Sequence, residues 1–184
     1  MKPRGPLMIE HRLIEKMLRV IAEEAGRIEK GGKVDPLFID AAVDFVRVYA
    51  DRTHHGKEED ILFKQLAQKG LSAEHSRAMA DLVDEHRQAR ERVKLLVSAR
   101  ERYGNGDVGA VKEMIAIMEW LADFYPRHIR KEDADFFPAT EEYFSKEELD
   151  SLLAAFHDFD GKMIHEKYEA LVKKLQAQED GGST

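Results

Sequence analysis

The sequence contains no cysteine, and this absence excludes several kinds of site at once. Without thiols the chain forms no disulfide, no thiolate metal site, no cysteine nucleophile and no iron–sulfur cluster bound by its own side chains. It also lacks any run of about 18 or more apolar residues, and its first residues lack the apolar core of a signal peptide. We therefore expect a cytoplasmic protein without a membrane span.

A concentrated basic patch is also missing, and the net charge is −7. This balance argues against nucleic acid or an anionic membrane surface as the main partner. With 184 residues, 43% of them hydrophobic and 35% charged, the chain is long enough for one substantial helical domain.

Alternation with a period of two is almost absent, so the sequence leaves no room for a sheet. Apolar residues recur instead at helical spacing, between turn signals and the helix-capping residues Asp35, Ser72, Asp107 and Ser145, and Pro138 is expected to end the fourth long helix. The expected helices cover residues 6–30, 36–69, 72–103, 107–137, 146–156 and 161–175. Four long helices joined by short loops predict an all-α protein, an antiparallel up-down four-helix bundle with extra C-terminal helices. We expect the bundle over residues 1–140, a packed helical extension over 141–178 and a disordered tail over 179–184.

One motif occurs twice at helical spacing. Residues 54–59 are HHGKEE and residues 128–133 are HIRKED, 74 residues later. On a helix, histidine and the glutamate four positions on share one face, so each copy presents one nitrogen and one oxygen donor together. A single copy is more typical of a solvated polar face, but a second pair repeats with it: E-H-R occurs at residues 10–12 and at 85–87. The chain is thus two copies of one helical hairpin.

The four histidines of these motifs are expected at one depth in the bundle. Counted at 1.5 Å per residue from each turn, His11 and His54 both lie about 18 residues from the first turn. His86 and His128 lie about 18 and 20 residues from the third turn, so all four fall into one layer. Their neighbours one turn away are apolar, which directs them inward.

Buried imidazoles and carboxylates need partners, and a cation supplies them. The predicted donors are His11, His54, His86 and His128 together with Glu58 and Glu132. Six donors exceed the needs of one four-coordinate zinc ion, and one carboxylate from each repeat suits the bridges of a dinuclear centre.

These ordered motifs resemble the hemerythrin-like (HHE cation-binding) family, a four-helix bundle that holds a non-haem di-iron site. The resemblance covers roughly residues 6–138 and implies terminal ligands at the four histidines and bridging carboxylates at the two glutamates. Alignment of the repeats pairs His54 with His128 and His55 with Ile129. We therefore predict that His54 and Glu58 point inward and that His55 and Glu59 do not.

The chain departs from the oxygen-carrying members of that family at one ligand. Those proteins have a second histidine one turn after the third-helix ligand, and here that position is Arg90. His165, on the last helix, is the candidate that would restore a ligand if this helix folds back over the bundle.

The resemblance implies two iron ions, with zinc or manganese as alternatives, and a small ligand such as oxygen, nitric oxide or peroxide. We expect sensing, scavenging or storage of that ligand rather than a dedicated enzyme, although peroxidase- or catalase-like activity fits the same site. The alternatives are an iron-donating or iron–sulfur cluster repair factor, and an interaction module that the metal stabilises.

Overall fold

The computed structural model describes residues 2–161 and 163–181, and every regular element in them is a helix. The prediction of an all-helical protein is therefore confirmed. The elements are α1 (Arg4–Glu29), α2 (Pro36–Asp44), η1 (Phe45–His55), η2 (Glu58–Phe63), α3 (Lys64–Leu66), α4 (Ala73–Gly104), α5 (Ala110–Arg130), η3 (Lys131–Phe136), α6 (Phe137–Thr140), η4 (Glu141–Tyr143), α7 (Lys146–Asp160) and α8 (Met163–Gly181).

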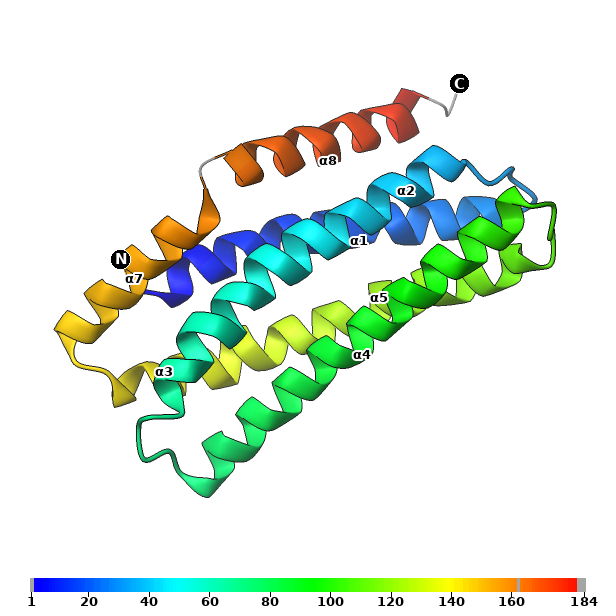
Figure 1. The fold of residues 1–184 in the computed structure, drawn as a ribbon. Helices are drawn as coiled ribbons and strands as arrows, with labels where there is room; N and C mark the ends of the chain where they lie inside the picture. The colour runs from blue at the N-terminus through cyan, green and yellow to red at the C-terminus, as the bar shows by residue number, and fades with distance from the viewer. Residues whose placement is uncertain (1, 162, 182–184) are drawn as a thin grey trace.

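Long helical segments lie side by side along most of the molecule (Figure 1). The stretch from α2 through η1 and η2 to α3 forms one such segment, and α5 continues through η3 into α6 in the same way. Helix α5 packs against α1 and α4, and η1 also contacts both α1 and α4. These contacts enclose an interior between α1, η1, α4 and α5.

The capping signals of the sequence act as predicted at several helix starts. Asp35 accepts a hydrogen bond from the Leu37 amide, and Pro36 occupies the first turn of α2. Ser72 caps α4, and Ser145 forms a full capping box with Glu148 at the start of α7.

Some boundaries differ from the prediction. Asp107 bonds to the Gly109 amide, and α5 begins only at Ala110, so Asp107 shapes the turn before the helix. Pro138 does not end the fourth segment, because it lies in the first turn of α6, where a missing amide hydrogen is tolerated. Helix α8 runs to Gly181, beyond the expected end near residue 175, because residues 176–179, QAQE, are good helix formers. The remainder of the expected tail, residues 182–184, lies outside the described residues.

Three segments are π-helical rather than α-helical: η1, η2 and η3. The segments η2 and η3 begin within one position of each other in the aligned repeats, since η2 starts at Glu58 and η3 at Lys131, the counterpart of Lys57. A π-helix has more residues per turn than an α-helix, and such segments are frequent at functional sites. The wider π-helical turns therefore lie in the two stretches that carry the repeated histidine–glutamate motif.

The apolar interior is divided into two clusters by a polar layer. Along α1, Leu7 belongs to one cluster and Ile14 to the other, with His11 between them. Along α4, Leu82 and Ala89 lie in different clusters on either side of His86. The histidines thus occupy one level inside the molecule.

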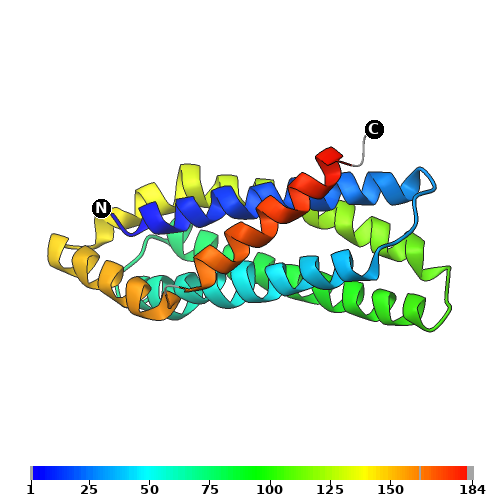
Figure 2. The same cartoon turned by 90° about the horizontal axis from the view of Figure 1, so that it is seen from above.

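The C-terminal helices lie against this core. Helix α8 crosses α1 and η1 (Figure 2), and its Tyr168 and Val172 are buried there. Helix α7 contacts η2. Among the described residues, no helix combines the length and the apolarity needed to cross a bilayer.

Candidate metal centre

Six of the seven predicted donor residues meet in the polar layer. Four helical segments supply them, and each side chain is at most 2% exposed: His11 on α1, His54 on η1, Glu58 on η2, His86 on α4, His128 on α5 and Glu132 on η3. Residues up to 121 positions apart in the chain are thereby brought into one buried cluster.

Each inner glutamate lies between the same two pairs of imidazoles and turns one carboxylate oxygen toward each pair. One carboxylate oxygen of Glu58 lies 3.3 Å from His54 Nε2, and its other oxygen lies 3.4 Å from His86 Nε2. Glu132 repeats the arrangement, with one oxygen 3.2 Å from His11 Nε2 and the other 3.3 Å from His128 Nε2. Both carboxylates therefore connect the pair His11 and His54 with the pair formed by His86 and His128.

The inner atoms of the cluster have no hydrogen-bond partners among the described residues. These atoms are both carboxylate oxygens of Glu58 and of Glu132, and Nε2 of His11 and of His54. Unpaired buried polar atoms are rare because each one loses its hydration without compensation. Nitrogen and oxygen atoms that converge in this way suit a metal ion, so the residues fit the predicted cation.

An outer ring of carboxylates orients the four imidazoles. Each accepts a hydrogen bond from one histidine Nδ1 at 2.7 or 2.8 Å: Asp133 from His11, Glu10 from His54, Glu59 from His86 and Glu85 from His128. Carboxylates in this position fix the tautomer, so that Nε2 offers its lone pair to the interior. Sequence analysis predicted Glu59 and Asp133 outside the donor set, but it did not identify Glu10 or Glu85.

The lysine of the repeated motif completes this ring. Lys57 contacts Glu10, and Lys131 contacts Glu85 at the corresponding place in the second repeat. Their surroundings differ, because Lys57 also contacts Asp160 of α7 and is fully buried, whereas the Lys131 side chain is 55% exposed. The first repeat is thus covered by the C-terminal helices, and the second is open.

Carboxylates also determine the charge of two imidazoles. Burial alone would lower the pKa of His11, but its hydrogen bond to Asp133 and the charge of Glu132 outweigh burial and raise the pKa to about 9. Burial would also lower the pKa of His128, but Glu132 and Glu85 outweigh burial and raise this pKa to about 10. Both rings are therefore protonated at neutral pH when no metal is bound.

The pKa values of the two inner glutamates are shifted in opposite directions. Burial and the charge of Glu132 raise the pKa of Glu58 well above its usual value. Burial also acts on Glu132, but the surrounding imidazoles, His128 above all, hold the pKa of Glu132 well below its usual value. The two pKa values thus move in opposite directions, and a bound cation would stabilise the ionised form of both carboxylates.

His165 lies apart from these six residues. Its Nε2 is 3.1 Å from Asp160 and 3.5 Å from Glu10, and its Nδ1 is 3.1 Å from the Tyr49 hydroxyl. It groups with Glu10 and Asp160 rather than with the inner donors. The last helix does fold back over the first repeat, but it brings His165 to the outer ring.

The prediction that His55 points away from the interior is wrong. The side chain is 1% exposed, and its ring stacks on His86 with centroids 3.8 Å apart. Sequence analysis assumed an α-helix, in which adjacent residues point about 100° apart. Ile129, the counterpart of His55 in the second repeat, is also buried although it lies in the α-helix α5, so the position after the repeated histidine faces the interior in both halves.

The family scan agrees with the motifs. The model of the Hemerythrin HHE cation binding domain matches residues 6–140 and, in an overlapping second match, residues 78–182. The chain belongs to this family, and a cation-binding role follows from that membership. No match was found among curated proteins or among solved structures.

The outer carboxylates generate a first prediction. Glu85→Gln should lower the affinity for metal about 10- to 100-fold, because the His128 imidazole loses the acceptor that orients it. The matched control is Glu119→Gln, an exposed glutamate of α5, the helix that carries His128. Competition with a chromophoric chelator measures both affinities, and equal affinities in the two variants would contradict the role of Glu85.

The raised pKa values of His11 and His128 generate a second prediction. Metal binds neutral imidazole, so uptake at pH 7 must release the protons of these two rings. Affinity should rise by about tenfold per pH unit for each released proton and should level off above the pKa values of about 9 and 10. Calorimetry in buffers of different ionisation enthalpy counts the protons. Affinity independent of pH between 6 and 9 would contradict this assignment.

Proposed function

We propose that the chain is a non-haem di-iron protein that binds a small diatomic or peroxide ligand. The ions would be held by His11, His54, His86 and His128 and bridged by Glu58 and Glu132, inside an antiparallel up-down four-helix bundle. The observation that carries the proposal is the position of the two glutamates, each with one oxygen toward each pair of imidazoles. One ion could not use all of these donors at once.

Iron suits the donor set and the family. Imidazole and carboxylate ligands without thiolate also accept zinc, manganese and cobalt, so the choice of iron depends on membership of the hemerythrin family. When bound, iron supplies what the side chains lack: a change of oxidation state and coordination positions for an exogenous ligand.

The protein surrounds a cavity that gives small molecules access to the cluster. Its volume is about 180 Å³, several times the share of one water molecule in the liquid, which is about 30 Å³. The lining includes His55, His86, Ala89, Arg90 and Tyr125. The cavity therefore reaches the cluster from the side of η1 and α4, which α7 and α8 leave uncovered. Oxygen, nitric oxide and hydrogen peroxide are all small enough to enter it.

The Tyr125 hydroxyl is placed to donate a hydrogen bond to a ligand in this cavity. Its hydroxyl is buried and has no partner among the described residues. Burial and the charge of Asp51 raise the pKa of Tyr125, so the hydroxyl keeps its proton at neutral pH. A ligand in the cavity would thus meet a fixed donor. Arg90 stands beside it and is held by hydrogen bonds of 2.7 Å to Asp51 and Glu59.

Iron loading tests the proposed function. Protein loaded without oxygen should bind two irons per chain, and its absorption spectrum should change when oxygen, nitric oxide or peroxide is added. His54→Ala should lower the iron content, whereas His75→Ala should not, because His75 bonds to Tyr143 outside the cluster. One iron per chain would overturn the dinuclear centre. Two irons with no spectral response would favour a metal-stabilised interaction module.

The same experiment tests the part that Tyr125 plays. Tyr125→Phe should retain two irons per chain but should bind the added ligand several-fold more weakly, because the donor is lost. Tyr103→Phe, at the far end of α4, is the control and should behave as the wild type. Equal ligand affinity in both variants would show that the Tyr125 hydroxyl does not contact the ligand.

A further inference from the structure

His55 has the same pattern of contacts as the four predicted ligands. Its Nδ1 lies 3.4 Å from Asp51, and Arg90 holds the same Asp51 oxygen at 2.7 Å. Its Nε2 is buried and has no hydrogen-bond partner among the described residues. A carboxylate at Nδ1 and a free Nε2 are the features that orient an imidazole toward a metal.

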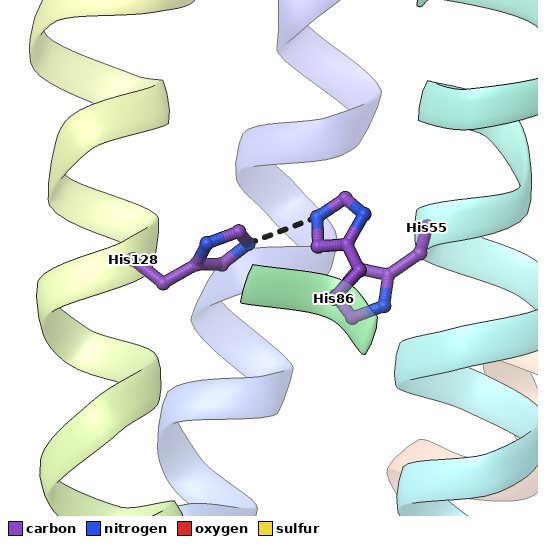
Figure 3. Close-up of side chains that lie close together, drawn as sticks. All are labelled: His55, His86 and His128. Carbon is purple, nitrogen blue, oxygen red and sulfur yellow. Dashed lines mark hydrogen bonds between the residues drawn. The ribbon is translucent and has the colours of Figure 1, made fainter. Parts of the chain in front are cut away.

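Three imidazoles meet at this end of the cluster. Nitrogen atoms of His55, His86 and His128 all lie within 4.8 Å of one another. They come from η1, α4 and α5, and Figure 3 shows the three rings together. His55 and His86 are stacked in parallel, and an imidazole lone pair lies in the plane of its ring, so His55 has to turn out of this stack to bind the same ion as His86. The group therefore has the donor type and the proximity of a three-histidine metal site.

The contact between two of these rings indicates where a cation would lie. The Nε2 atoms of His86 and His128 are 3.1 Å apart, as the dashed line in Figure 3 marks. Each ring already donates from Nδ1 to a carboxylate, Glu59 or Glu85, so each neutral ring has a lone pair at Nε2. Two lone pairs at this distance need a proton or a metal ion between them.

An ordinary packing role does not account for His55. The corresponding residue of the second repeat is Ile129, which is buried to a similar degree, so an apolar side chain satisfies that position. An imidazole with an unpaired buried nitrogen would be a costly substitute for isoleucine unless the nitrogen had a use.

We propose that His55 is a fifth imidazole ligand, which acts with His86 and His128 on one ion of the centre. This inference rests on the proposed dinuclear function and raises the number of protein donor residues from six to seven. Arg90 then has an indirect positioning role. It occupies the place one turn after His86, and it holds Asp51, which in turn contacts His55.

The test compares variants that separate ligation from packing. His55→Phe keeps an aromatic ring against His86 but removes both nitrogens, and His75→Ala is a control outside the cluster. In proton NMR of the cobalt-loaded proteins, each metal-bound imidazole should give one strongly shifted, exchangeable N–H signal. We expect five signals in the wild type and in His75→Ala, and four in His55→Phe. The affinity of His55→Phe for the second cobalt ion should fall at least tenfold, because losing a ligand should lower the affinity at least as much as losing the carboxylate that orients a ligand.

The outcomes distinguish the two proposals. A wild type that binds two cobalt ions but gives only four signals, unchanged in number in His55→Phe, overturns the role of His55 and leaves the dinuclear centre standing. A wild type that binds one ion overturns the dinuclear centre, and the inference about His55 with it. Circular dichroism of metal-free His55→Phe checks that the fold is retained, and Asp51→Asn, which keeps His55, should weaken binding without removing a signal.

Discussion

The burial of two carboxylates inside an apolar helical protein is the constraint on which the rest of this structure depends. Glu58 and Glu132 are fully buried, and none of their four oxygens has a hydrogen-bond partner among the described residues. Such groups are costly unless positive charge is close. The surrounding imidazoles supply part of that charge, and a pair of metal ions would supply the remainder. The four helical segments are held at one level by this requirement.

The two halves of the internal repeat contribute equally to the charged groups of the cluster. Each half supplies two imidazoles and one inner glutamate, and its E-H-R glutamate orients the second histidine of the same half. The acid after the inner glutamate reaches the other half instead: Asp133 holds His11, and Glu59 holds His86. The halves are thus joined by hydrogen bonds to these histidines as well as by apolar packing.

The C-terminal helices make the two halves unequal. Asp160 and His165 contact Lys57 and Glu10 of the first repeat, whereas the Lys131 side chain of the second repeat is 55% exposed. The cavity that reaches His55 and His86 opens on another side, between η1 and α4. A small molecule that entered this cavity would pass Arg90 and Tyr125, which line it.

The sequence predicted that the six inner histidines and glutamates lie together, because they repeat in order and because helix length fixes their depth. The helical class and the caps at Asp35, Ser72 and Ser145 also followed from local signals. The outer carboxylates Glu10 and Glu85 were missed, although each directly precedes a predicted histidine in both repeats. The burial of His55 was missed, although its counterpart in the second repeat is the apolar Ile129, which is itself buried.

The central claim is that Glu58 and Glu132 join two ions into one centre. Electron paramagnetic resonance of the oxidised, iron-loaded protein tests it most directly. Two ferric ions bridged by shared ligands couple their spins, so the account predicts two irons per chain by metal analysis and almost no ferric signal. A strong signal of isolated high-spin ferric iron, equivalent to the iron present, would contradict it.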